Sequence, residues 1–175
     1  MPLFGGSHRP PLDGLTKDEQ KRRDELNPEV LRRAGEGGVA GQGPAALTVL
    51  RQKAETEPGD CLWALLLGAQ FMSMQRYALA IDAFMDATRR DGNEVRAFYG
   101  AGAAYFQAGE AKQQHGPATT DEVAPVALTV DNLYQEALRS FRRALELTNE
   151  KKERDTLGLA IGAVEKALAK KAGRL

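Results

Sequence analysis

The sequence predicts an all-α fold, and three observations support this prediction. Apolar residues recur with helical spacing almost continuously from Asp60 onwards. No segment alternates between apolar and polar residues for long enough to predict a strand, and the nearest candidate, residues 126–130, has no evident partner. Residues 64–71 resemble residues 98–105, 34 positions later, which indicates an internal helical repeat.

The chain divides into a loose N-terminal part and a packed remainder. Half of its 18 glycines lie in residues 1–59, whereas ten of its eleven aromatic residues fall between Trp63 and Phe141. We therefore expect residues 1–43 to form a flexible N-terminal arm with short charged helices. Residues 44–172 are expected to form a helical repeat domain.

The arm contains two predicted helix starts. Residues 16–19, Thr-Lys-Asp-Glu, form a capping box, in which the threonine and the glutamate each accept a hydrogen bond from the other's backbone N–H. Asn27-Pro28 combines an N-cap with a proline in the first helical position. The second helix should end in the glycine-rich residues 35–38, because glycine is a poor helix former.

The domain contains six predicted helices. The first covers residues 44–56 and is ended by Pro58-Gly59, after which Asp60 is a good N-cap for the second. The later helices are predicted over residues 61–74, 77–90, 94–115, 132–148 and 151–172.

Two helices of the domain recur at matching positions. Four residues of the helix over 61–74 recur 34 positions later, and four of the helix over 77–90 recur 57 positions later, which is one period plus a 23-residue insertion over 111–133. Small residues let helix backbones approach, aromatic residues fill the space between helix pairs, and each pair must be covered by the next. The recurring sets are Ala64, Leu67, Gly68 and Phe71 with Phe98, Ala101, Gly102 and Tyr105, and Tyr77, Ala80, Phe84 and Ala87 with Tyr134, Ala137, Phe141 and Ala144.

These patterns resemble those of the tetratricopeptide repeat family. Residues 67–71, Leu-Gly-x-x-Phe, and residues 80–84, Ala-x-x-x-Phe, match the family pattern, although Gly92 stands where proline is usual. The resemblance covers residues 44–172. It implies a stack of antiparallel helical hairpins, with about two full repeats, a preceding half-repeat and a C-terminal capping helix.

The resemblance also implies a binding surface, because in this family the first helix of each repeat lines a concave face that takes ligands. The helix over 61–74 carries a second apolar stripe, roughly 120° from the stripe used by the repeat, and both must be covered. We expect the groove to bind an apolar peptide or an amphipathic helix of another protein, with Arg96 and Tyr99 as its polar groups. The expected protein-binding residues are Leu62, Leu65, Ala69, Met72, Ser73, Arg96, Tyr99, Ala103, Phe106 and Gln107.

Other covers for this apolar stripe remain open. Leu12 and Leu15 of the arm, with Leu3 and Phe4, could cover it, as could the insertion over 111–133 or a second copy of the protein. The sequence therefore predicts a non-catalytic interaction adaptor or a chaperone-like binder of an apolar segment. A structural, self-associating module is the alternative.

The residue inventory argues against an enzyme. The charges of the 24 basic and 24 acidic residues of the chain cancel, so the protein has no overall electrostatic field to attract nucleic acid or an anionic membrane. One cysteine, Cys61, and two histidines leave little for metal binding or for a catalytic triad. The position of Cys61 at a helix N-terminus would favour a lowered thiol pKa, although a small packing residue is the simpler interpretation.

The sequence also lacks the signals of cofactor binding and of membrane targeting. The glycines of residues 35–43 follow no strand, so we expect no dinucleotide site and no cofactor. The first ten residues do not resemble a signal peptide, and no apolar run approaches the roughly 20 residues of a membrane span. We therefore expect a soluble, cytoplasmic protein.

Overall fold

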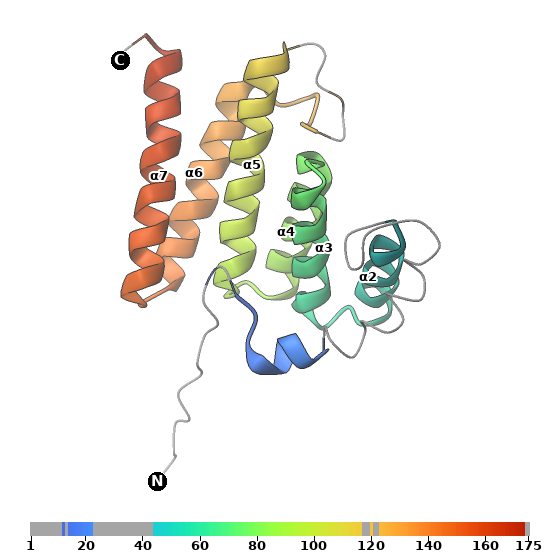
Figure 1. The fold of residues 1–175 in the computed structure, drawn as a ribbon. Helices are drawn as coiled ribbons and strands as arrows, with labels where there is room; N and C mark the ends of the chain where they lie inside the picture. The colour runs from blue at the N-terminus through green and yellow to red at the C-terminus, as the bar shows by residue number, and fades with distance from the viewer. Residues whose placement is uncertain (1–11, 13, 23–43, 117–119, 121–122, 174–175) are drawn as a thin grey trace.

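The protein is a set of packed helices in the computed structural model, which describes residues 12, 14–22, 44–116, 120 and 123–173. No strand occurs in these residues, so the all-α prediction is confirmed. Figure 1 shows α5, α6 and α7 side by side, with α3 and α4 next to α5. A short helix over residues 17–22 lies at the bottom of this view, whereas the C-terminus lies at the top. The longer helices are α2 (Pro44–Thr56), α3 (Cys61–Ser73), α4 (Tyr77–Arg90), α5 (Val95–His115), α6 (Val130–Leu147) and α7 (Lys151–Lys171).

The predicted helix boundaries agree with the structure because the caps are local. Asp60 accepts a hydrogen bond from the backbone N–H of Leu62 at 2.9 Å, as expected of an N-cap. Helix α6 begins two residues before the predicted position, because Thr129 and Asn132 form a capping box that the sequence analysis missed. Residues 126–130, the nearest candidate for a strand, form none: 126–129 are turn and loop residues and Val130 opens α6. The helix predicted from Asn27-Pro28 lies outside the described residues.

The core consists of two clusters of buried apolar side chains. One lies among α3, α4 and α5, and the other joins α5 to α6 and α7, so α5 contributes to both clusters. Helix connections of only three or four residues, such as 74–76 and 91–94, keep consecutive helices in contact along their lengths.

Glycines in α3 and α5 let aromatic rings approach the helix backbone. An added Cβ at Gly68 would lie 2.8 Å from the ring of Phe84, and one at Gly102 would lie 2.7 Å from the ring of Phe141. These are matching positions of the two recurring sets, and both rings are buried. Gly100 also lies against Phe84, so this ring is held between α3 and α5.

The predicted insertion is shared between helices and a short connecting loop. Residues 111–115 belong to α5 and residues 130–133 to α6. The ammonium group of Lys112 donates hydrogen bonds to the backbone carbonyls of Pro125 and Val126, both at 3.1 Å, and so ties the loop to α5. Ala124 is buried in the first core cluster, and none of the described residues of this loop lines the groove.

Candidate functional site

An apolar groove of about 410 Å³ lies between α3, α5 and the described part of the arm. Helix α3 contributes aliphatic and small side chains, and α5 contributes an arginine, a tyrosine and small residues. Six of the ten predicted site residues line this groove. The lining residues are Leu12, Gly14, Leu15, Leu65, Leu66, Ala69, Met72, Phe84, Arg96, Tyr99, Gly100 and Ala103.

Helix α3 lines the groove because it is apolar on two sides. Ala64, Gly68 and Phe71 face the core, where each is buried. Ala69 is exposed and Met72 half-buried on the side toward the groove. The first apolar stripe of α3 therefore faces the core. Of the second stripe, Leu65, Ala69 and Met72 line the groove and Leu62 does not.

Four of the predicted residues do not line the groove. Leu62 is only 1% exposed, so its side chain is part of the protein interior. Ser73 is exposed at the end of α3, where its hydroxyl donates to the Gln70 carbonyl at 2.7 Å. Phe106 packs against the ring of Tyr134 with ring centroids 5.7 Å apart. Gln107 is exposed outside the groove.

Tyr99 combines an aromatic wall with a free hydroxyl. Its ring lies 5.7 Å from that of Phe141, centroid to centroid, so it is tied to the second core cluster. The hydroxyl makes no hydrogen bond to any described residue. Tyr99 can therefore offer a ligand one polar group in an otherwise apolar lining.

Arg96, the other predicted polar group, is already paired in the structure. Its guanidinium donates to both carboxylate oxygens of Glu19, at 2.9 and 2.7 Å, and to those of Glu94, at 2.9 and 2.8 Å. The side chains of Arg96, Glu19 and Glu94 are only 10%, 12% and 14% exposed, respectively. The arm is thus held to the start of α5 by a nearly buried, bidentate ion pair.

The predicted capping box positions Glu19 for this contact. The backbone N–H of Glu19 donates to the Thr16 hydroxyl at 3.2 Å, and the backbone N–H of Thr16 donates to the Glu19 carboxylate at 2.8 Å. The same carboxylate therefore closes the box and binds Arg96. Leu12 and Leu15, just before the box, reach the groove lining, which places the arm at one side of the groove.

The Glu19 carboxyl should titrate at a lower pH than an ordinary glutamate. Burial alone would raise its pKa, but the Arg96 guanidinium and the Thr16 hydrogen bonds outweigh burial and hold the pKa below its usual 4.5. A lowered pKa means that ionisation favours docking of the arm at neutral pH, and that this contribution is lost as the pH falls through the lowered value.

We expect a carboxyl ¹³C titration of the folded protein to show the Glu19 midpoint below 4.5. Arg96→Met should move the midpoint upward, and Arg139→Met, which removes an exposed arginine from α6, should leave it unchanged. A Glu19 midpoint at or above the ordinary value in the unaltered protein would mean that the ion pair does not persist in solution.

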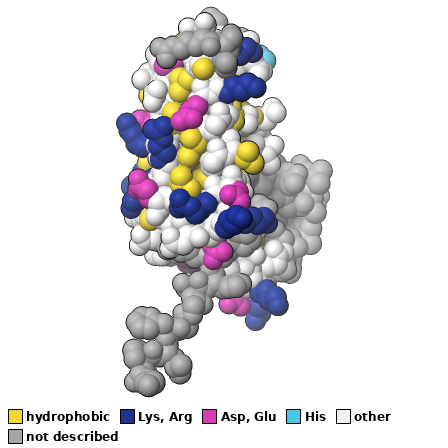
Figure 2. Space-filling view, turned by 90° about the vertical axis from the view of Figure 1, so that its left-hand side faces the viewer, with side chains coloured by type: hydrophobic (Ala, Val, Ile, Leu, Met, Phe, Trp, Pro, Cys, Tyr) yellow, Lys and Arg dark blue, Asp and Glu magenta, His cyan; other side chains and the backbone are white. Residues whose placement is uncertain are grey.

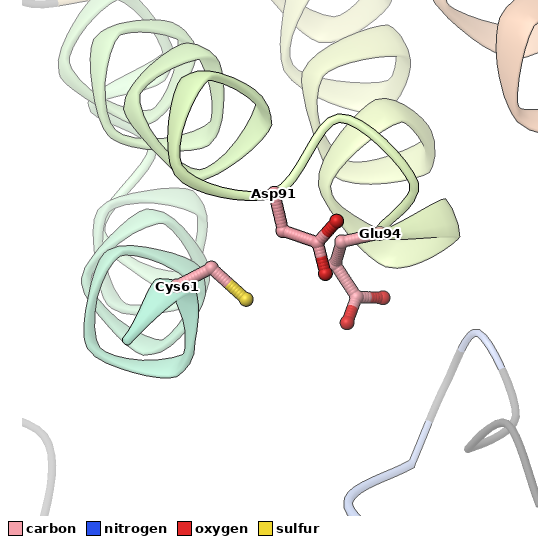
Figure 3. A group of neighbouring side chains, drawn as sticks. All are labelled: Cys61, Asp91 and Glu94. Carbon is pink, nitrogen blue, oxygen red and sulfur yellow. The ribbon is translucent and has the colours of Figure 1, made fainter. Parts of the chain in front are cut away.

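One group of possible metal ligands lies close together in the described part of the chain. Cys61, Asp91 and Glu94 come from the starts of α3 and α5 and the end of α4, and their ligand atoms lie within 4.8 Å of one another (Figure 3). Burial, together with the carboxylates of Glu94, Asp91 and Asp60, raises the pKa of the Cys61 thiol to about 11. A cation would have to displace this proton and compete with Arg96 for Glu94, so we assign no metal to the group.

The lowered thiol pKa considered for Cys61 is therefore wrong. A helix N-terminus stabilises a thiolate, but here the neighbouring carboxylates and burial act in the opposite direction. Cys61 packs against the first core cluster, as expected of a small packing residue. The sequence did not indicate that these three residues lie close together. Cys61 is separated from the other two by α3 and α4, and the three share no motif.

Among the described residues that line the groove, the only ionisable side chains are those of Arg96 and Tyr99, so these residues form no set of acid, base and nucleophile. His115, the histidine that the structure describes, is exposed at the end of α5 and does not line the groove. In the described ranges, no helix is both long enough and apolar enough to cross a membrane.

Comparison with known proteins leaves the chain without an assigned family. No protein-family model matches it, and no curated protein matches it in sequence. The arrangement of the groove is therefore the basis for a functional interpretation.

Proposed function

We propose that this chain is a non-catalytic protein-binding module that takes an apolar peptide segment, or one face of an amphipathic helix, in the groove between α3 and α5. The observation that carries the proposal is the groove itself. It is lined mostly by apolar and small side chains, and it offers the Tyr99 hydroxyl, which makes no hydrogen bond to a described residue. Met72 provides an adaptable contact surface. Such a surface suits an apolar ligand with few fixed hydrogen bonds.

We propose further that the helices form a tetratricopeptide-like stack, as an adaptor or scaffold would use. Support comes from the two close contacts of Gly68 with Phe84 and of Gly102 with Phe141, which occur at matching positions of the recurring sets. In such a stack the first helix of each repeat would line the concave face, and α3 and α5 contribute eight of the twelve residues that line the groove. A cytoplasmic location belongs to the same proposal.

A second candidate is a structural module whose groove is covered from within. Leu12 and Leu15 already line the groove, and Glu19 anchors the arm to Arg96. The two candidates differ in what happens when another apolar segment is offered. In a binding module the arm gives way to the segment, whereas in a closed structural module the groove stays occupied.

The test is a selection from a displayed library of random peptides. We expect the unaltered protein to enrich apolar peptides, and Ala69→Glu to bind them at least about tenfold more weakly, since it places an unpaired carboxylate in an apolar groove. Ala163→Glu makes the same change at an exposed position on α7 and is the matched control. Failure to enrich any peptide, or equal binding by both variants, would contradict the proposal.

Deletion of residues 1–15 separates the two candidates. If Leu12 and Leu15 compete with the ligand, the shortened protein should bind the selected peptide more tightly, because the open groove is then populated at all times. If the arm is a permanent structural cover, deletion should lower the denaturation midpoint and expose the groove to aggregation without specific peptide binding.

A further inference from the structure

Two glycines in the middle of α7, Gly158 and Gly162, have no packing role among the described residues. Glycine is a poor helix former, so a glycine inside a helix usually allows something to approach closely. Elsewhere in the described helices this holds, since Gly68, Gly100 and Gly102 each lie against a buried aromatic ring. An added Cβ at Gly158 or Gly162 would meet nothing within 4 Å.

Both glycines are exposed on the outer face of α7, which no other described helix covers. Asp155, Leu159, Gly162 and Lys166 follow one another at spacings of four, three and four residues, and all four are exposed. Such a spacing places them along one line of the helix. Leu159 is 78% exposed and, with Val126, is one of two large apolar side chains that are exposed in the described residues. Figure 2, which looks onto this side of the molecule, shows a narrow hydrophobic strip flanked by charged side chains.

The charges on this line are complementary to a second, reversed copy of it. Asp155 and Lys166 are equally far from the midpoint between residues 160 and 161, as are Leu159 and Gly162. Two such helices packed antiparallel would place Asp155 against Lys166 of the other copy twice, and Leu159 over Gly162 twice. A parallel pair would place like charges together. Neither Asp155 nor Lys166 makes an ion pair with a described residue.

We propose that the outer face of α7 is a homodimer interface, in which two copies pack antiparallel about the middle of this helix. The dyad makes every contact occur twice, as in most closed dimers. The glycines allow the two backbones to approach, and the leucine of each copy fills the space above a glycine of the other. One helix from each copy gives a small interface, so we expect a weak dimer that depends on concentration. This surface is separate from the groove between α3 and α5.

The test is sedimentation equilibrium over a wide range of concentration. We expect the mass to rise from 19.0 kDa toward twice that value. Asp155→Lys and Lys166→Asp should each weaken the dimer at least tenfold, because each places like charges opposite each other. An equimolar mixture of the two single variants should again dimerise, since each copy then faces opposite charges. The double variant Asp155→Lys/Lys166→Asp should also recover the dimer.

The variant Gly162→Ala is an independent test of the interface. In the monomer it should raise the melting temperature, because the added methyl group meets open space and alanine favours the helix. In the dimer it should weaken association, because the methyl group would lie under the leucine of the other copy. A constant mass of 19.0 kDa, or a dimer unaffected by both charge changes, would overturn the proposal. So would a dimer that is lost in Ala69→Glu but retained in Asp155→Lys, since the groove would then be the interface.

Discussion

Phe84→Ala is expected to lower the free energy of unfolding by about 3–5 kcal/mol. The Phe84 ring is 6% exposed and lies between α3 and α5, close to the backbone at both Gly68 and Gly100. Alanine would leave a cavity that glycines on either side cannot fill, because they have no side chains. The measurement is chemical denaturation followed by far-ultraviolet circular dichroism at low protein concentration.

Leu159→Ala is the matched control for this prediction. It also truncates a large apolar side chain on a helix, but Leu159 is 78% exposed. Its effect on the monomer should stay within about 0.5 kcal/mol. A loss for Phe84→Ala as small as that of the control would mean that the ring does not join α3 to α5.

Gly100→Ala is expected to destabilise the protein by about 1–3 kcal/mol, although alanine favours a helix over glycine. The new Cβ would lie 2.5 Å from the nearest ring atom of Phe84, which is closer than side chains pack. Either the ring or α5 must therefore move. Thermal and chemical denaturation of the purified variant measure the cost.

A double-mutant cycle identifies the cause of that cost. In a Phe84→Leu background the smaller side chain leaves room for the Cβ, so Gly100→Ala should cost less than it does in the unaltered protein. Gly158→Ala, where the Cβ meets open space, should instead stabilise the monomer by up to about 1 kcal/mol. If Gly100→Ala costs the same in both backgrounds, the close approach to Phe84 is not its cause.

The helices could be predicted from the sequence because their signals are local. Apolar spacing and the cap at Asp60 depend on residues within a few turns, and the structure agrees with both. The repeated pattern also predicted that Gly68 and Phe84 have packing roles, and the structure brings the two into contact. The start of α6 was predicted two residues late, because its capping box lies inside the segment interpreted as an insertion.

The arrangement of the arm could not be predicted in the same way. The sequence around Glu19 resembles an exposed charged helix, and its capping box specifies a helix start without specifying a partner. Arg96, which binds it, is 77 residues away in the chain. Nothing local distinguishes this glutamate from its charged neighbours, so the pairing depends on tertiary structure alone. Leu12 and Leu15 were considered as a cover for the groove, and the structure places both of them in its lining.

The candidate site was predicted best where the helix pattern alone decides orientation. Ala69 and Met72 lie on the second apolar stripe of α3 and line the groove. Leu62 lies on the same stripe but is 1% exposed, so membership of the stripe did not by itself predict which residues line the groove. For α7 the sequence predicted a C-terminal capping helix, whereas the open space above Gly158 and Gly162 is visible only in three dimensions.

The most direct measurement for the groove is methyl NMR of the protein with and without a selected peptide. Our account predicts that the peptide shifts the methyl signals of Ala69, Met72 and Ala103, all of which line the groove. The methyl signals of Leu159 and Ala163 on the outer face of α7 should not move at concentrations where the protein is monomeric. Shifts confined to α7, or spread evenly over the whole chain, would contradict the assignment of the groove as the binding surface.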